Sequence, residues 1–519
     1  MTYIAERSRE DKAYANLGNA HHSLGDSNTF KDYGEGNACG NLGDAHYCLG
    51  DLKTARDYHQ KELEIAKGLD DTSEEGKVYC NLGNAHYSLR DFKTARNYHE
   101  RHLKIAIQLG DRSREGKAYC NLGDAYYCLG DLKTAVDYHE RHLKIVIELG
   151  DRSGEGTAYS NLGNTHHSLG DFKTATDYYK RHLRIAKELG DRSGEGTTYS
   201  NLGNTHHGLG DFKTAIDYHE RHVKIAIELG DRSGKGSAYR NLGNACYRLG
   251  DFKTAIDYHE RHLKIAKELG DRSGEGKAYG NLGIAFNCLG DFKKAIDYHE
   301  RHLRLTEEMG ERSGEGNAYG NLGNAHLSLG DFKTARVYYE RHLNIAKELG
   351  DRLGEGNAYG NLGSAYHSLG DFKTAIDYPE RQLKIAKELG DRLGEGNAYG
   401  NLGSAHHSLR DFKTAIDYHE RHLKIAKELG DRSAEGKGYS HFGNIYCSVG
   451  DFKTAIDYHE RNLKIAKELG DKSGEGKAYG NLGIAHWSLG DFKTAIDYYE
   501  RHLKIAIELG DRSAEGKGY

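Results

Sequence analysis

Pairs of histidines three residues apart are the first candidates for chemistry in this sequence. Six segments read His-Glu-Arg-His, at residues 99–102, 139–142, 219–222, 259–262, 299–302 and 419–422. Two imidazoles at this spacing share one face of a helix and could bind a metal ion. However, no third ligand recurs beside them, and Tyr replaces the first His at Tyr179, Tyr339 and Tyr499. A position that His shares with Tyr is typical of a packed ring, so we expect half-buried aromatic rings and no metal site.

A second candidate is the glycine-rich segment Gly274-Glu275-Gly276-Lys277, which could suggest a phosphate-binding loop. Such a loop needs a glycine where Asp271 stands, and Ser or Thr where Ala278 stands. The segment is therefore interpreted as a turn and a helix cap. The same patterns recur along the chain, whereas an active site is normally single, so we expect neither catalysis nor a cofactor.

Two columns of asparagine are the strongest candidates for a binding surface. The first column is the Asn of a recurring Asn-Leu-Gly triplet, and the second lies three residues later, on the same stripe of a helix. A carboxamide is both a donor and an acceptor, so a ladder of carboxamides could hydrogen-bond an extended peptide at regular intervals. The predicted peptide-binding residues are Asn81, Asn84, Asn121, Asn161, Asn164, Asn201, Asn204, Asn241, Asn244, Asn281, Asn321, Asn324, Asn361, Asn401 and Asn481.

All of these patterns repeat with a period of forty residues. The Asn-Leu-Gly triplet recurs from Asn41 to Asn481, with one departure at His441-Phe442-Gly443. A second block, usually Gly-Asp-Phe-Lys-Thr-Ala, recurs at the same spacing, which gives twelve complete units between about residues 34 and 510. A period of this length indicates an array of stacked structural units rather than several separate globular domains.

One unit, residues 191–230, shows which elements carry these residues. We expect a first helix, helix A, over 194–209 with Ser193 as its N-cap, and Gly210 as the left-handed residue that ends it. Asp211 should cap a second helix, helix B, over 212–229. Apolar residues recur at helical spacing in both, including Leu209 in helix A. Each unit is therefore predicted to be an antiparallel helix pair.

The sequence resembles the tetratricopeptide repeat family. The matching residues of one unit are Tyr199, Leu202-Gly203, His206, Gly210-Asp211-Phe212 and Ala215, followed by His219. The forty-residue units are most similar to those of the Partner of Inscuteable type of G-protein-signalling modulator and of large invertebrate repeat arrays. The resemblance implies an all-α, right-handed superhelical α-solenoid whose helix A residues line a concave groove. The GoLoco peptides that bind G proteins in those modulators do not occur in these 519 residues.

Two segments and one proline depart from the repeat. Residues 1–33 are interpreted as a damaged or truncated first repeat, residues 34–510 as the twelve units, and residues 511–519 as the stub of a further repeat of a longer array. Pro379 stands in the middle of a helix B, where other units have His or Tyr. Proline removes a backbone N–H and clashes with the preceding turn, so we expect a kink there.

Composition limits the class of partner and the location. The chain has 73 basic and 78 acidic residues, a net charge of -5, without the basic excess that nucleic-acid binding needs. We find no apolar run long enough to span a membrane and no signal peptide near Met1. The eight Cys residues form no CxxC pair, which favours free thiols in the reducing environment of the cytoplasm.

These observations predict a non-catalytic scaffold that binds extended or helical segments of other proteins in the concave groove. Two alternatives stay open: the array is the repeat region of a longer signalling protein or enzyme, or it is a structural array that self-associates through uncapped ends. A structural role also stays open for the first asparagine column, in which each Asn bonds a neighbouring repeat. Helix A varies more than helix B, at columns such as Tyr87, His167, Asn287, Leu327 and Trp487, which indicates either diversification for binding or drift after duplication.

Overall fold

Antiparallel α-helices account for all regular secondary structure in the described part of the chain. The computed structural model describes residues 28–509, and within that range it contains no strand. Contacts divide the chain into two units, Met1–Asp271 and Arg272–Tyr519. The first unit contains α2 (Asn28–Cys48), α3 (Leu52–Gly68), α4 (Thr72–Ser88), α5 (Phe92–Leu109), α6 (Arg112–Cys128), α7 (Leu132–Glu148), α8 (Arg152–Ser168), α9 (Phe172–Glu188), α10 (Arg192–Gly208), α11 (Phe212–Glu228), α12 (Arg232–Arg248) and α13 (Phe252–Leu269).

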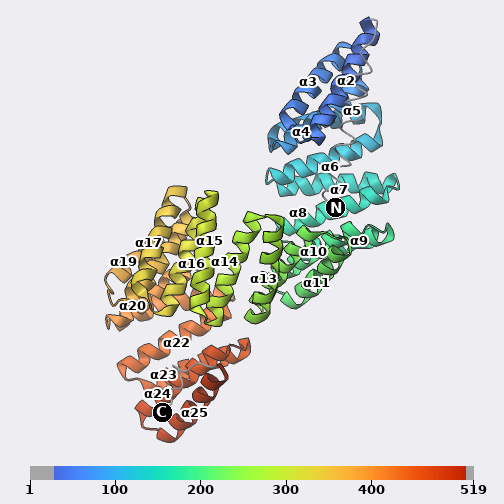
Figure 1. The fold of residues 1–519 in the computed structure, drawn as a ribbon. Helices are drawn as coiled ribbons and strands as arrows, with labels where there is room; N and C mark the ends of the chain where they lie inside the picture. The colour runs from blue at the N-terminus through green and yellow to red at the C-terminus, as the bar shows by residue number, and fades with distance from the viewer. Residues whose placement is uncertain (1–27, 510–519) are drawn as a thin grey trace. The chain divides into compact units, whose positions relative to one another are not determined.

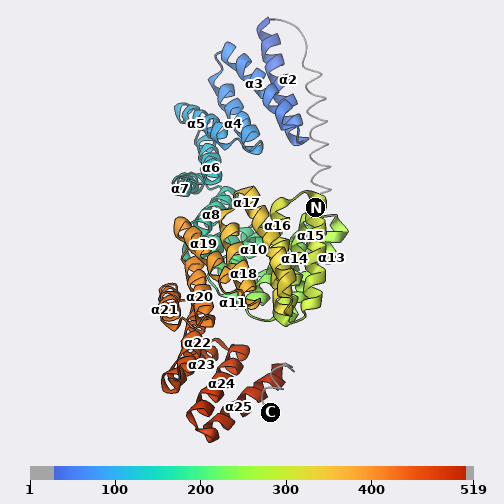
Figure 2. The ribbon, with the colours of Figure 1, turned by 90° about the vertical axis from the view of Figure 1, so that its left-hand side faces the viewer.

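The second unit continues the same alternation of helix A and helix B. Within each unit, every helix packs on the helices before and after it, as Figures 1 and 2 show. The helices of the second unit are α14 (Arg272–Leu289), α15 (Phe292–Met309), α16 (Arg312–Leu329), α17 (Phe332–Leu349), α18 (Arg352–Ser368), α19 (Thr374–Leu389), α20 (Arg392–Ser408), α21 (Phe412–Glu428), α22 (Arg432–Val449), α23 (Phe452–Leu469), α24 (Lys472–Leu489) and α25 (Phe492–Leu509).

The two turns of most repeats use the same glycine–aspartate chemistry. Gly190 and Gly210 adopt left-handed backbone angles, with φ of 67° and 77°, and each ends a helix. The following residue caps the next helix, since the Asp191 and Asp211 side chains accept hydrogen bonds from the backbone N–H of the third helical residue. The expectation that Ser193 is the N-cap was therefore wrong. Asp191 takes that role, because its carboxylate accepts directly from Gly194 N.

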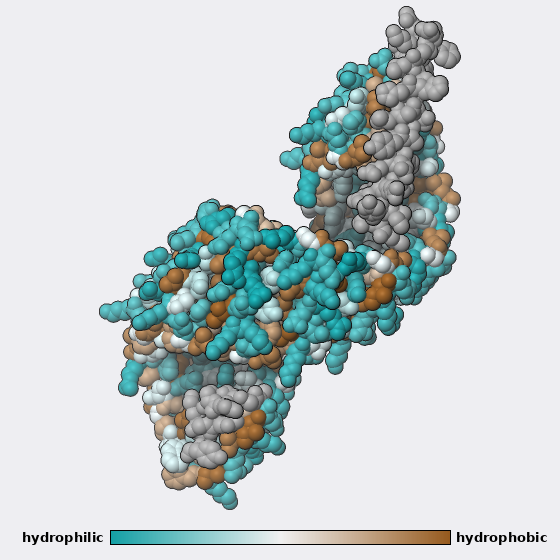
Figure 3. Space-filling model, in the orientation of Figure 1, coloured by the Kyte–Doolittle hydropathy of each residue, from teal (hydrophilic) through white to brown (hydrophobic). Residues whose placement is uncertain are grey.

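The core of a repeat lies between helix A and helix B. Leu202 in α10 is fully buried, and so are its counterparts from Leu82 to Leu482 apart from Phe442, which is nearly so. Leu209, which the sequence placed on the apolar face, is instead 50% exposed at the end of the helix. The surface in view in Figure 3 is mainly hydrophilic, with hydrophobic residues scattered in small patches.

The interpretations of both chain ends fall mostly outside the described residues. Residues 1–27 and 510–519, which include the expected stub at 511–519, are not described. The helix α2 begins at Asn28, inside the segment 1–33 that we interpret as a damaged repeat. None of the described helices is long and apolar enough to cross a membrane.

The helix that contains Pro379 starts later than its counterparts. The helix α19 runs through Pro379 without a break, but it begins at Thr374, whereas α11 and α21 begin at the equivalent phenylalanines, Phe212 and Phe412. Proline cannot donate to the carbonyl four residues earlier, at Ala375, and its ring crowds that turn. The structure thus shows a loosened first turn over residues 372–373 in the helix that contains Pro379.

Replacing this proline tests the cost of the loosened turn. We expect Pro379→His to restore a helix from Phe372 and to raise the free energy of unfolding by about 3 kcal/mol, the usual cost of proline inside a helix. Chemical denaturation monitored by circular dichroism measures the change. The matched control is His419→Pro in the next repeat, which should lower stability by a similar amount. Equal midpoints for Pro379→His and the parent would contradict this account.

Candidate functional site: the helix A stripe

The predicted asparagines share one stripe on the helices A. Residues three apart on a helix point the same way, so both columns follow the same side of α4, α6 and their successors. Neither column is fully buried. The half-buried members are Asn81, Asn84, Asn121, Asn161, Asn164, Asn201, Asn241, Asn244, Asn281, Asn321, Asn361, Asn401 and Asn481, and the exposed members are Asn204 and Asn324.

In the first unit the two columns are joined by hydrogen bonds between repeats. Four first-column Asn residues donate from Nδ2 to the second-column side chain of the preceding helix A, 37 residues earlier. The pairs are Asn121 to Asn84 at 3.3 Å, Asn161 to Asp124 at 3.1 Å, Asn201 to Asn164 at 3.4 Å, and Asn241 to Asn204 at 3.1 Å. We call this run, from Asn84 to Asn241, the carboxamide ladder.

Helix B also reaches the second column in two repeats. The hydroxyl of Tyr179 donates to Asn164 Oδ1 at 2.7 Å, and that of Tyr339 donates to Asn324 Oδ1 at 2.8 Å. In the second unit, where Ser364 replaces the second-column Asn, Asn401 donates instead to the backbone oxygen of Gly360 at 3.4 Å. The carboxamides therefore link neighbouring repeats, although to a helix A rather than to a turn.

The carboxamides nevertheless keep some capacity for a further partner. An asparagine side chain has two N–H donors and an oxygen that accepts two hydrogen bonds. The ladder bond from Asn241 uses one of its donors, and its acceptor Asn204 is exposed. Linking repeats and binding a peptide are thus compatible roles for the same side chains.

The variable column of helix A makes contacts between repeats as well. The Tyr87 hydroxyl lies 3.2 Å from Cys128 Sγ, Tyr127 lies 2.8 Å from Ser168, and His167 Nδ1 lies 3.1 Å from Thr205 Oγ1. Near the end of the second unit, this stripe becomes apolar. Ile484 and Trp487 of α24 are 52% and 58% exposed.

The histidines of helix B are more deeply buried than the sequence suggested. The side chain of His219 is 1% exposed, and its Nδ1 has no hydrogen-bond partner. Burial lowers the pKa of His219 to about 3 and that of His139 to about 4, so the rings are neutral near pH 7. Of the twelve paired rings, eleven are buried in the core, whereas His302 is half-buried as we expected.

The glycine-rich segment and the candidate metal ligands of the sequence form no site in the described residues. The segment Gly274–Lys277 lies in the first turns of α14, after a turn between helices. Among the described residues, no three His, Cys, Asp or Glu side chains are arranged to hold a metal ion.

Comparison with known proteins identifies the repeats. The profile of the tetratricopeptide repeat family matches residues 35–108, 114–188, 154–228, 194–268, 234–308, 314–388, 355–428 and 436–508. The chain belongs to the tetratricopeptide repeat family. No curated protein sequence matches it. The expected all-α solenoid of antiparallel helix pairs is confirmed by this match and by the helices of both units.

Solved structures with similar folds come from several kinds of protein. A signal-transduction ATPase with a tetratricopeptide repeat sensor from Pyrococcus horikoshii is 18% identical to this chain, with a TM-score of 0.50. The match covers 70% of this chain and 54% of the ATPase chain. BtubC from P. vanneervenii is 24% identical, with a TM-score of 0.39, over 42% of this chain and 92% of its own. A Rap protein complexed with Competence and Sporulation Factor is 14% identical, with a TM-score of 0.49, over 69% of this chain and 99% of its own.

The buried histidines of this tetratricopeptide repeat protein predict a loss of stability in acid. The folded state holds His219 neutral, whereas the unfolded chain takes up a proton near pH 6.5, so protons favour unfolding. Stability should be complete above about pH 7. It should then fall towards pH 4, by about 1.4 kcal/mol per pH unit for each such histidine. Urea denaturation at pH 7.5, 6 and 5 measures this dependence.

A matched variant isolates one of these histidines. Tyr already occupies the position in three repeats, so His219→Tyr should fold. The variant should take up one proton fewer than the parent when it unfolds in acid, so its free energy of unfolding should depend less steeply on pH. Parent and variant curves with the same slope below pH 6 would show that the His219 ring is protonated in the folded protein.

Proposed function

We propose that this protein is a non-catalytic scaffold that binds extended or helical segments of other proteins along the helix A stripe. The observation that carries the proposal is the carboxamide ladder, which presents a donor and an acceptor once per repeat. A peptide backbone also presents donors and acceptors at regular intervals, so the two patterns are complementary.

Binding of this kind needs several repeats at once. A hydrogen bond between a peptide and a solvent-accessible carboxamide contributes about 1 kcal/mol, because water competes for both groups. Only the sum over neighbouring repeats can reach useful affinity. The ladder bonds from Asn121 to Asn84 and from Asn161 to Asp124 support the proposal, since they hold neighbouring side chains of the two columns in a fixed register before a partner arrives.

Specificity would come from the variable columns beside the ladder. Tyr127 and His167 lie on this stripe in the first unit, and the exposed Trp487 lies on it in the second. Side chains of the partner would meet a different environment at each repeat. The backbone would be held by the asparagines, and the sequence of the partner would be selected by these neighbours.

A triple substitution in the ladder tests the proposal. Peptides that bind the parent protein are first selected from a random twelve-residue display library, and their affinities are measured by calorimetry. Replacing Asn161, Asn201 and Asn241 by Ala should weaken this binding by about 1 kcal/mol for each lost hydrogen bond. The same variant should also unfold at a lower urea concentration, because three bonds between repeats are lost.

The control removes three exposed side chains from helices B of the same repeats, Lys173, Lys213 and Lys253. Their replacement by Ala should change neither binding nor stability appreciably. If the selected peptides bind the triple asparagine variant as tightly as the parent below its unfolding transition, the ladder has only a structural role.

A further inference from the structure

The first complete repeat differs from the others at one buried position of helix B. Glu62 in α3 stands where nine other repeats have the second His of the helix B motif, such as His102 and His142. The remaining two exceptions are Gln382 and Asn462. A carboxylate in a histidine position changes the charge of the interior, so its surroundings need an explanation.

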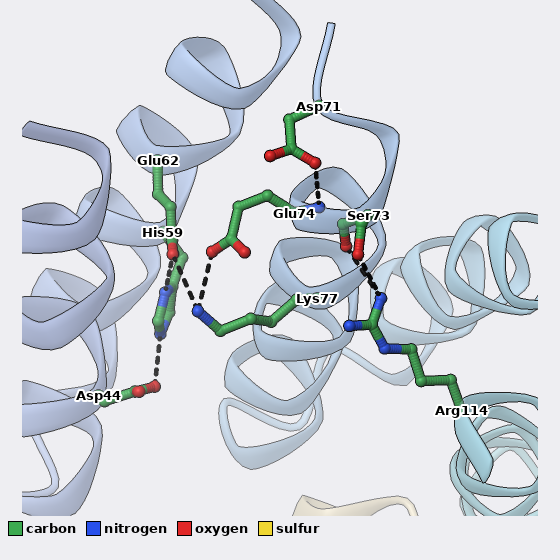
Figure 4. A network of polar contacts seen from close by, with 8 residues as sticks. All are labelled: Asp44, His59, Glu62, Asp71, Ser73, Glu74, Lys77 and Arg114. Atoms are coloured by element: carbon green, nitrogen blue, oxygen red, sulfur yellow. Dashed lines mark hydrogen bonds and ion pairs between the residues drawn. The ribbon is translucent and has the colours of Figure 1, made fainter. Parts of the chain in front are cut away.

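The Glu62 carboxylate is buried and only partly satisfied. Its side chain is 1% exposed, and its Oε2 accepts from His59 Nδ1 at 2.9 Å. The other oxygen, Oε1, is buried without a hydrogen-bond donor. Lys77 Nζ forms a long ion pair with this oxygen at 3.9 Å, beyond hydrogen-bonding distance, and donates a hydrogen bond to Glu74 Oε1 at 2.8 Å (Figure 4). An unsatisfied buried carboxylate oxygen is costly, so a donor that reached Glu62 would be strongly favoured.

A cavity lies against this carboxylate, between α2, α3 and α4, which lie side by side in both ribbon views (Figures 1 and 2). Its volume is about 90 Å³. Ile65, Ala66 and Leu69 form an apolar wall, whereas Glu62, Asp71 and Glu74 supply carboxylates. The cavity therefore combines a place for methylene groups with a negatively charged end.

A second cavity at the equivalent place provides an internal comparison. It lies between α22, α23 and α24, has a volume of about 160 Å³, and is lined by Asn462 together with Lys437 and Lys477. In a repeat with histidine at this position, the ring takes up the place, as His422 does with Nδ1 2.8 Å from the oxygen of Gly396. The two cavities share their position in the repeat but differ in charge, and only the first has a buried carboxylate.

We propose that the cavity at Glu62 binds the primary ammonium group of a lysine side chain from a partner protein. An ammonium group donates up to three hydrogen bonds, and its positive charge would balance the negative charge of the carboxylates. The cavity has room for an ammonium group together with the methylenes next to it. The Glu62 carboxylate would gain a charged partner, and the lysine methylenes would pack on Ile65 and Leu69.

The position of the cavity connects it to the helix A stripe. Lys77 lies four residues before Asn81 on α4, and therefore on the same face as the asparagine columns. The inference rests on the proposed function for the source of the lysine, since it places a lysine-binding cavity at one end of the peptide-binding stripe. The cavity itself does not depend on the carboxamide ladder.

Lys77 is a cation close to the site, so it should compete with a lysine of the partner for the carboxylates. Its ammonium group partly neutralises the carboxylates and would repel an incoming lysine. Thr occupies the equivalent position at Thr157 and Thr197. Replacing Lys77 by Thr should therefore tighten lysine binding while leaving the fold unchanged.

The test uses the full chain and a small probe, Nα-acetyl-lysine methylamide, with binding followed by saturation-transfer NMR of the probe. The neutral norleucine analogue and the arginine analogue are the matched ligands. We expect the lysine probe to bind the parent, with at least tenfold weaker binding to Glu62→His and to Glu62→Gln, because a charged hydrogen bond is lost. Lys77→Thr should bind more tightly than the parent, and Asn462→His should bind as the parent does.

Several outcomes would overturn the proposal. Lysine binding that is unchanged in both Glu62 variants would place the probe elsewhere, and equal binding of the norleucine analogue would show that charge is not recognised. The Gln variant keeps the size of Glu62, so it remains informative if the His variant unfolds. Because the probe has no peptide partner, loss of peptide binding in the asparagine variant and loss of probe binding in the Glu62 variants are separate results.

Discussion

The contact between a ring of helix B and the bare α-carbon of a glycine in helix A determines how closely the two helices of each repeat approach. A Cβ added to Gly163 would lie 2.6 Å from the ring of Tyr179, so close that the ring or the helix would have to shift. The His219 ring is pressed against Gly203 in the same way. Glycine in a helix costs about 1 kcal/mol relative to alanine, so its recurrence in the triplet is explained by this close approach.

The other features of the repeat follow from that contact. With the glycine against the ring, the preceding Leu points into the core, where Leu202 is fully buried, and Asn201, the residue before Leu202, is turned towards the half-exposed stripe. The polar edge of the ring then faces the second asparagine column. Tyr179 uses this geometry to donate to Asn164, and His139 Nε2 lies 3.8 Å from Asp124. Core packing and the candidate binding surface are therefore joined through the same residues.

Much of this could be predicted from the sequence, because the turns and helices depend on local residues. The glycine–aspartate pairs ending at Asp191 and Asp211 predicted both turns, although the choice of Ser193 as a cap overlooked that the two turns use the same pair. The ladder partners could not be predicted, since Asn161 and Asp124 meet only after adjacent repeats are stacked at a particular rotation. The cavity at Glu62 had a visible signal, a single acidic residue in a histidine column, but its volume depends on three helices packing together.

The most direct test of the central contact is a double-mutant cycle between Gly203 and His219, read as free energies of unfolding in urea. If the contact sets the helix spacing, Gly203→Ala should destabilise the protein by about 1–3 kcal/mol despite the better helix propensity of alanine. In the His219→Ala background the same change should be neutral or stabilising, which gives a coupling energy of at least about 1 kcal/mol. Additive effects of the two substitutions would contradict the account.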